Sequence, residues 1–183
     1  MTCAANLAEL AVKMKNVGRA GTFVKVIDIL RDDVDIIFRF EFCQFNYYNT
    51  RGNYLMADSV VNEALKTDTL NELYLFAKST VMLNLKKYGD CLKFSDQLIK
   101  LNPNLADIYY NGGIACLNIA QRMDSRKYKK QIKKMYEKAK PYMEKYREMA
   151  PDEKDKWAPA LYRIYFNLNM GKQFDEIDKI LRK

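Results

Sequence analysis

Residues 101–120 read LNPNLADIYYNGGIACLNIA, and this stretch decides the fold. Pro103 ends one helix, because its nitrogen carries no hydrogen and its ring disfavours a helical conformation in the residue before it. Asn104 leads into a second helix, in which an aromatic pair precedes small residues that begin at Gly112. The stretch therefore predicts two helices joined by a short turn.

An Asn-Pro turn followed by Tyr109, Tyr110, Gly112, Gly113 and Ala115 resembles the start of a tetratricopeptide repeat (TPR). The unit of that family has 34 residues in two antiparallel helices and carries a proline at its end. The resemblance implies that Gly113 stands at the eighth position of its repeat, where a small residue lets the two helices approach closely. The run YGDCLKFSDQLIKLNP, residues 88–103, is similar to the second-helix signature of the family.

The rest of the chain keeps the same register. Counting back from Ala106 in steps of 34 places repeat starts at Glu72, Phe38 and Ala4. The positions at which the family packs helix against helix are then apolar or aromatic in every repeat. Position 11 holds Met14, Tyr48, Met82 and Cys116, position 20 holds Phe23, Ala57, Cys91 and, after an insertion in the fourth repeat, Ala139, and position 27 holds Leu30, Ala64, Leu98 and, after the same insertion, Tyr146.

The resemblance predicts an all-α, single-domain α-α superhelix, a TPR-like right-handed solenoid of about ten helices in five helix-turn-helix repeats. The predicted repeats are residues 4–37, 38–71, 72–105, 106–153 and 154–183. The closing region of the chain also resembles bacterial TPR proteins whose function is unassigned.

The start of the second repeat offers a competing reading. The alternation Phe-Arg-Phe-Glu-Phe, residues 38–42, by itself indicates a β-strand. The register and the continuing aromatic pattern favour a helix, with a turn at residues 51–54 in which Gly52 is free to adopt a positive φ.

The fourth repeat contains about fourteen extra residues, near 121–135. Tyr128, Ile132 and Tyr136 keep a helical period through this region, so we expect both helices of the repeat to be about two turns longer, roughly 10 Å. They would form a hairpin arm whose inner seam is Tyr128 and Ile132. Pro141 should kink the second of these helices.

The composition argues against an enzyme. The chain has no histidine, which removes the commonest general base and the usual nitrogen ligand of zinc. No pair of carboxylates is placed for catalysis and no glycine run forms a phosphate loop, so we expect no catalytic residue, no cofactor and no metal. Four cysteines without a C-x-x-C motif predict free, buried thiols.

The sequence carries no targeting feature that we recognise. No apolar run approaches the length of a membrane span, about 20 residues. The first residues lack the basic and apolar regions of a signal peptide. The sequence as printed therefore predicts a cytoplasmic protein, or an exported one if an upstream leader was removed.

The family binds partners in a concave groove lined by the first helix of each repeat, at positions that include 5 and 13. Position 5 supplies aromatic side chains and position 13 supplies Asn84 and Asn118, whose amides could grip the backbone of an extended peptide. The alternative is that these asparagines merely cap their own helices. The candidate groove residues are Phe42, Asn46, Phe76, Asn84, Tyr110, Asn118, Tyr162 and Tyr165.

The net charge of +8 belongs entirely to one region. Residues 121–147 hold eleven basic and three acidic residues, and the rest of the chain is balanced at 20 of each. Such a region attracts phosphate backbones, acidic partners or anionic lipid, although lysines also serve merely to keep a helix soluble. The candidate basic arm consists of Lys127, Lys129, Lys130, Lys133 and Lys134.

The favoured function is a non-enzymatic scaffold that binds a peptide or protein segment in the groove. The alternatives are an electrostatic binder of nucleic acid or anionic surfaces through the basic arm, and a structural fragment of a larger protein. We expect a monomer or a weak end-to-end dimer.

Overall fold

The computed structural model describes the backbone of residues 34–182 and the side chains of residues 41–182. The chain divides into two compact units, Met1–Thr69 and Leu70–Lys183, and each is treated by itself. The predicted first repeat, residues 4–37, lies almost wholly outside the described residues, and the predicted total of ten helices stays a prediction.

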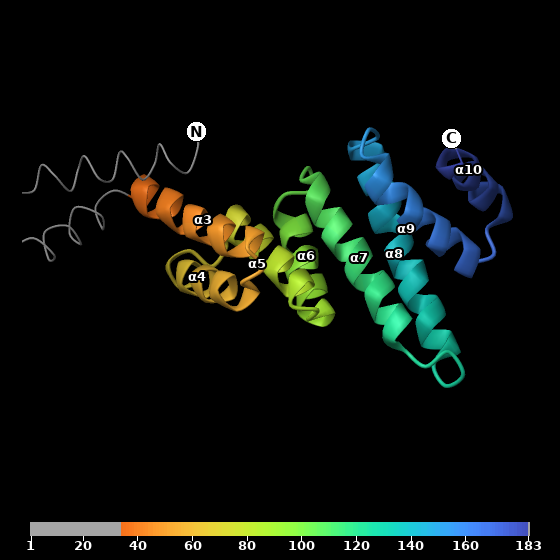
Figure 1. Cartoon of the computed structure of the whole chain (residues 1–183), viewed down its shortest axis with the longest axis horizontal. Coiled ribbons are helices and arrows are strands. Elements are labelled where there is room, and N and C mark those ends of the chain that lie inside the picture. Colours follow the sequence, from red (N-terminus) through yellow and green to blue (C-terminus); the bar gives the residue numbers. More distant parts are fainter. Residues whose placement is uncertain (1–33, 183) are drawn as a thin grey trace, which may run out of the picture. The chain divides into compact units, whose positions relative to one another are not determined.

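The described part of the first unit is one helix pair, α3 (Val34–Thr50) and α4 (Tyr54–Thr67), which pack against each other (Figure 1). Residues 38–42 lie within α3, so the strand reading is wrong. Helical packing against α4 overrides the local alternation. Gly52 has the predicted positive φ, +75°.

The second unit consists of six helices: α5 (Glu72–Asn84), α6 (Tyr88–Leu101), α7 (Ala106–Arg122), α8 (Lys129–Met149), α9 (Lys154–Asn167) and α10 (Gly171–Leu181). Each helix packs against the next, and α7 also contacts α5 and α9 (Figure 1). The structure thus has eight helices and no strand over residues 34–182, which confirms the all-α class.

The turns inside three helix pairs use the same backbone geometry. Gly52, Lys86 and Asn169 each adopt a positive φ. In each turn the amide of the following residue donates 2.9 Å to a carbonyl five residues earlier, at Tyr48, Met82 and Tyr165 respectively. This arrangement satisfies carbonyl groups that the helix end would otherwise leave without a donor.

The helices α7 and α8 meet at two glycines. A Cβ atom placed on Gly113 would lie 2.8 Å from Cγ of Met143 on α8, and one placed on Gly112 would lie 3.3 Å from the ring of Tyr142. Met143 is fully buried. Gly113 therefore lies at a close approach of α7 and α8 that leaves no room for a side chain, as the resemblance implied.

The extra residues of the fourth repeat are divided between helix and loop. α7 has 17 residues against 13 in α5, and α8 has 21 against 14 in α6. The second helix is two turns longer, as predicted, but the first is only about one turn longer. Residues 123–128 form the connecting loop, because Met123 leaves the helix with an extended backbone.

The two internal prolines lie within continuous helices. α8 runs through Pro141 from Lys129 to Met149. α9 begins at Lys154, so Pro159 is its sixth residue and lies beyond the first turn. Amides in the first turn of a helix have no partner within it, but an amide at position 159 would have donated to the carbonyl of Asp155. Pro159 therefore removes one hydrogen bond from α9.

The cysteine prediction is right for two positions and wrong for one. Cys91 and Cys116 are free and fully buried. Cys43 is disulfide-bonded. Burial raises the pKa of the Cys91 thiol, and burial raises that of Cys116 to about 12.

Replacing Gly113 by alanine should lower the midpoint of thermal unfolding. Alanine favours a helix interior by about 1 kcal/mol, but the new methyl group would overlap a side chain that cannot move into solvent. Overpacking of this kind costs about 1–3 kcal/mol. The matched control is Gly89→Ala in α6, where no atom lies within 4 Å of the new carbon. If both variants melted alike, the close approach would not limit stability.

The stability of the fold should fall above about pH 9, and Cys116 should account for one proton of this effect. The folded state keeps the thiol protonated to about pH 12, whereas the unfolded chain releases this proton from about pH 9. The contribution is full below the lower value and is lost as the pH rises, which amounts to roughly 2–3 kcal/mol at pH 11. Urea unfolding of the wild type and of Cys116→Ala, compared at neutral and alkaline pH under reducing conditions, measures the difference; equal slopes would refute it.

Candidate functional site

In the second unit, α5, α7 and α9 are the first helices of successive pairs and lie side by side (Figure 1). Each carries one stripe of part-exposed or exposed side chains at helical spacing, and most of its other side chains are buried. The stripes are Leu73, Phe76, Thr80 and Asn84 on α5; Asp107, Tyr110, Ile114 and Asn118 on α7; and Pro159, Tyr162, Arg163 and Phe166 on α9. These twelve side chains constitute the first-helix face.

A buried polar network fixes α7 against the preceding helix pair. The side-chain amide of Asn111 donates to the hydroxyls of Ser79 (3.3 Å) and Thr80 (3.1 Å) on α5. The thiol of Cys91 on α6 donates to the backbone carbonyl of Asn111, and Ser79 also hydrogen-bonds to Ser95. Because these groups are buried and mutually bonded, they hold three helices in one register.

Contacts also join α7 to α9 and to α8. Arg163 donates to the side-chain oxygen of Gln121 at 3.2 Å. Tyr110 packs its ring against that of Tyr146 on α8, with centroids 5.2 Å apart. The neighbouring stripes are thus held side by side.

The predicted groove residues of the second unit lie at different depths. Phe76, Asn84, Tyr110 and Tyr162 are half-buried on the first-helix face, and the Tyr162 ring leans on Phe174 of α10 at 4.6 Å. Phe166, which sequence reasoning did not choose as a candidate, is the most open aromatic of the face at 64% exposure. Its place in the last turn of α9 could have indicated it.

Two predicted groove residues lie in the first unit. Phe42 and Asn46 are both half-buried on α3. Phe42 packs its ring 6.0 Å from that of Phe45 on the same helix. The backbone carbonyl of Asn46 accepts a hydrogen bond from the hydroxyl of Thr50.

The structure does not show the Asn118 amide turned toward a peptide, as the groove prediction required. Its side-chain amide donates 2.9 Å to the carbonyl of Ile114 in its own helix, which is the capping alternative. Thr50, at the same repeat position, likewise bonds to its own helix. Asn84 is half-buried at the end of α5.

The prediction that Tyr165 lines the groove is wrong. It is buried, with 3% of its surface exposed, and its hydroxyl donates 2.9 Å to Glu144 on α8. Burial, and then the bond to this carboxylate, raise the pKa of Tyr165. The helical period brought it into the candidate list, but its side of α9 faces the second helices.

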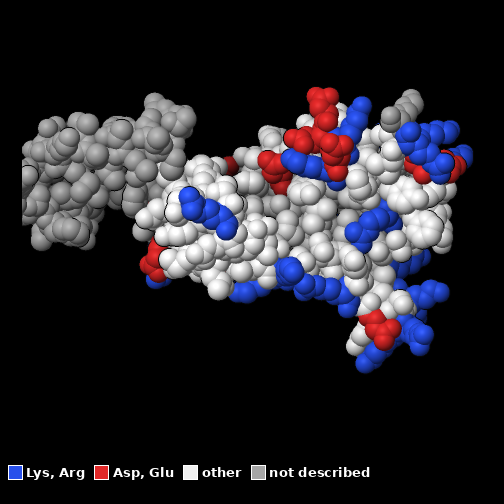
Figure 2. All heavy atoms as spheres, in the orientation of Figure 1, with Lys and Arg blue, Asp and Glu red and all other residues white. Residues whose placement is uncertain are grey.

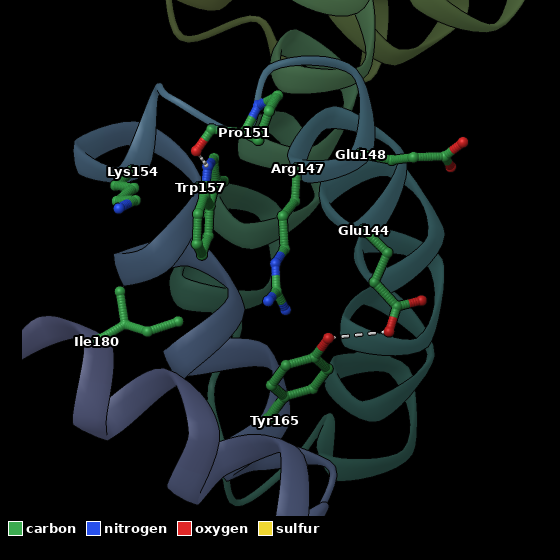
Figure 3. Close-up of a pocket in the computed structure, with 8 residues that line it drawn as sticks. All are labelled: Glu144, Arg147, Glu148, Pro151, Lys154, Trp157, Tyr165 and Ile180. Atoms are coloured by element: carbon green, nitrogen blue, oxygen red, sulfur yellow. Dashed lines mark hydrogen bonds between the residues drawn. The ribbon is translucent and has the colours of Figure 1, made fainter.

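A pocket of about 570 Å³ lies between α8, α9 and α10 (Figure 3). Trp157 and Tyr165 form its aromatic wall, and Ile180 lines it from α10. Arg147 stands 4.9 Å from the centre of the Trp157 ring and pairs with Glu176 at 2.6 Å. The pocket is therefore lined by one apolar wall, by three charged residues that have ion-pair partners (Glu144, Arg147 and Glu148) and by Lys154.

A second pocket, of about 500 Å³, lies between the second helices α6 and α8. Asp96 of α6 lines one side of this pocket. It accepts a hydrogen bond from the Tyr142 hydroxyl and forms an ion pair with Lys138 at 3.0 Å. Both pockets border second helices, so neither is a groove along the first-helix face.

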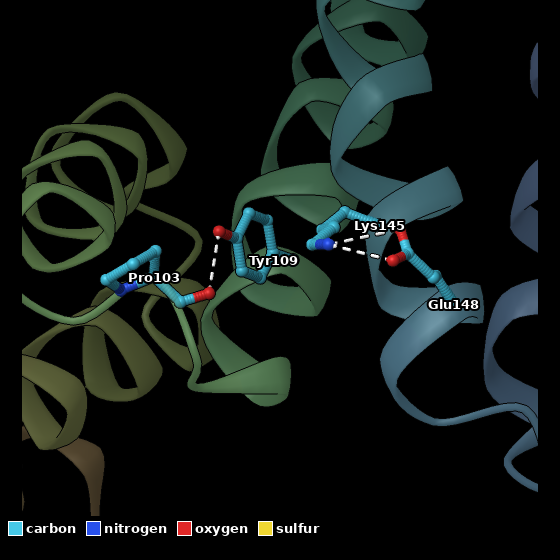
Figure 4. A network of polar contacts seen from close by, with 4 residues as sticks. All are labelled: Pro103, Tyr109, Lys145 and Glu148. Carbon is cyan, nitrogen blue, oxygen red and sulfur yellow. Dashed lines mark hydrogen bonds and ion pairs between the residues drawn. The ribbon is translucent and has the colours of Figure 1, made fainter.

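The first helices begin with a repeated contact. The hydroxyl of Tyr109 donates 2.9 Å to the carbonyl of Pro103 (Figure 4), and the indole of Trp157 donates 3.2 Å to the carbonyl of Pro151. Each aromatic residue follows its proline by six positions. On α8, Lys145 pairs with both oxygens of Glu148 in the same region (Figure 4).

The basic arm forms the free end of the α7–α8 hairpin. Figure 2 shows Lys and Arg gathered there on the visible face. Tyr128 is 36% exposed beside the start of α8, so it is not the predicted inner seam; Ile132 is half-buried. The predicted arm residues Lys127, Lys129, Lys130, Lys133 and Lys134 are all exposed.

No group of three or more His, Cys, Asp or Glu side chains in the described part of the chain could share a metal ion. Among the helices α3–α10, none combines the length and apolar character that crossing a membrane requires.

The structure defines an all-helical, TPR-like protein built of antiparallel helix pairs. A solved structure with this fold is "MamA MSR-1 C2", a TPR protein, at a TM-score of 0.58. The match covers 96% of this chain and 89% of MamA, with 15% sequence identity. The predicted resemblance to TPR proteins is confirmed at the level of the fold. No protein-family model and no curated protein matches this sequence.

Replacing Asn111 by alanine should destabilise the protein by about 1–3 kcal/mol, because buried hydroxyls on α5 would lose a donor. Asn118→Ala is the matched control: the same change on the same helix removes only a bond to the helix itself. Urea unfolding measures both variants. Similar losses would show that the buried network does not hold α5 and α7 together.

Proposed function

We propose that this chain is a non-enzymatic scaffold that binds a peptide or protein segment along the first-helix face. The observation that carries the proposal is the row of three part-exposed stripes on α5, α7 and α9. Side chains that stay partly exposed on adjacent, rigidly joined helices offer a continuous surface at no cost to the core.

The chemistry of this face suits a polypeptide. Phe76, Tyr110, Tyr162 and Phe166 supply aromatic surface, and aromatic residues dominate the energetics of protein interfaces. Thr80 and Asn84 add polar groups among them. The TPR-like fold supports the same reading, since proteins of this fold generally act through protein partners.

The capture of a peptide by a ladder of amides is not part of this proposal. The donor of Asn118 is already bonded within α7. Recognition would rest on aromatic contacts, with polar groups setting orientation.

Photocrosslinking tests the location of the interface. A benzophenone amino acid placed at Ile114 or Phe166 should crosslink a partner in extracts of the native cell, because both side chains lie on the first-helix face. The same amino acid at Lys93, which is exposed on second helix α6, is the control. Equal or greater crosslinking at Lys93 would place the interface elsewhere.

A point variant tests the energetics. Phe166→Glu should weaken binding of the crosslinked partner by about tenfold or more, since it places a charge in an apolar contact. The thermal midpoint should change little, because Phe166 is mostly exposed. Unchanged affinity would remove Phe166 from the interface.

A further inference from the structure

The two halves of α8 differ in how their charges are satisfied. In the second half every basic residue has a carboxylate partner: Lys138 with Asp96, Lys140 with Glu144, Lys145 with Glu148 and Arg147 with Glu176. In the first half, Lys129–Tyr136, there is no acidic residue at all. Only Lys133 reaches a carboxylate there, that of Glu137 at 3.9 Å.

The unpaired charges extend into the loop. Within the described residues, Lys127, Lys129, Lys130 and Lys134 have no ion-pair partner. Solubility alone does not explain this difference, because lysines interspersed with glutamates, as in the second half of α8, serve that purpose.

The position of these lysines also opposes helix formation. The N-terminus of a helix carries a partial positive charge and favours acidic residues, by about 0.3–1 kcal/mol each. α8 begins with Lys129 and Lys130, has no acidic residue in its first turn and receives no side-chain cap from Tyr128. A cluster that lowers the stability of its own helix is expected where function requires it.

The hairpin end also stands beyond its neighbours. α7 exceeds α5 by four residues, or about 6 Å, and α8 exceeds α6 by seven, or about 10 Å. The adjacent α5–α6 turn adds exposed Lys86 and Lys87 at the same end of the helix pairs. The positive surface is therefore extended rather than a single point.

We propose that the end of the α7–α8 hairpin binds an acidic polypeptide segment of a partner protein through Lys127, Lys129, Lys130 and Lys134. This proposal shares with the proposed function only the class of partner, a protein. The binding surface is a different one, since the arm and the first-helix face are separate.

The surroundings of the lysines favour a polypeptide over nucleic acid. Single-stranded nucleic acid needs aromatic rings on which bases can stack. The ring of Tyr88 is covered by Arg122 at 4.6 Å, and that of Tyr128 is approached by Lys127 at 5.2 Å. Between residues 121 and 135 only Arg122 and Arg126 carry a guanidinium that could bind a phosphate in bidentate fashion, and the other five cations there are lysines.

The surroundings also disfavour a lipid surface. Membrane-binding helices insert large apolar side chains. Between residues 121 and 135 Tyr128, at 36%, is the one exposed large apolar side chain. Lysines, as mobile point charges, suit the irregularly spaced carboxylates of a flexible acidic segment.

The test uses the whole chain and a fluorescein-labelled synthetic peptide rich in Asp and Glu. Fluorescence anisotropy should show binding at about 50 mM salt that weakens by about tenfold or more at about 300 mM. A peptide in which Asn and Gln replace the acidic residues should not bind. Failure of the acidic peptide to bind at low salt would overturn the proposal.

The decisive variant reverses the four unpaired lysines: Lys127→Glu, Lys129→Glu, Lys130→Glu and Lys134→Glu. Binding of the acidic peptide should be lost, while the thermal midpoint stays equal or rises, because glutamates favour the start of α8. Replacement of the same four lysines by arginine should preserve binding, since the charge is retained. The assignment would be overturned if the glutamate variant melted at a lower temperature and the arginine variant also lost binding.

A second variant controls for net charge. It changes the same number of exposed lysines outside the arm to glutamate: Lys93, Lys154, Lys172 and Lys179. This variant should keep most of the affinity; an equal loss would mean that overall charge, not the arm, attracts the peptide.

Further probes separate the partner classes. A single-stranded oligonucleotide of equal formal charge that binds tenfold more tightly than the peptide, or binding to phosphatidylserine vesicles but not to the peptide, would overturn the choice of an acidic polypeptide. Phe166→Glu should leave peptide binding unchanged. Failure of the arm and failure of the first-helix face are therefore distinguishable.

Discussion

The contact between Gly113 and Met143 is the constraint on which the second unit depends. With no side chain at Gly113, α8 lies close enough for Met143 to be fully buried against α7. The neighbouring residue Tyr142 then reaches Asp96 on α6, and Tyr146, one turn further, meets Tyr110. One close approach thus sets the contacts of α8 with both α6 and α7, and through them the position of the first-helix face.

The order and the repeat register of the described helices could be predicted because they depend on local chemistry at fixed spacing. Gly52 and Lys86, both with positive φ, are 34 residues apart, and each closes its turn with the same backbone bond. The contact of Tyr109 with the Pro103 carbonyl recurs in Trp157 and Pro151, 48 residues later, so the register is recovered after the extra residues. How those residues divide between helix and loop could not be predicted, since the helical period continues through the loop.

The predicted site was less accurate, because a repeat position specifies a side of a helix and not what a side chain bonds to. Asn118 lies on the expected side, yet its amide turns back to Ile114. Tyr165 follows the apolar period, yet its hydroxyl donates to Glu144 on the preceding helix, and Tyr165 itself is buried. Contacts of this kind join residues that are far apart in the sequence, and no local pattern encodes them. Tyr165 and Glu144, for example, are 21 positions apart.

The length of the hairpin gives its charge a reach that the same lysines would lack nearer the body. Fields between exposed charges decay over about 8 Å at physiological ionic strength. The end of the hairpin stands roughly that far beyond the neighbouring turns, so the carboxylates that pair with the second half of α8 neutralise little of its field. The longer helix pair therefore holds the lysines away from the carboxylates of the neighbouring helices, and this distance keeps the lysines available to a partner.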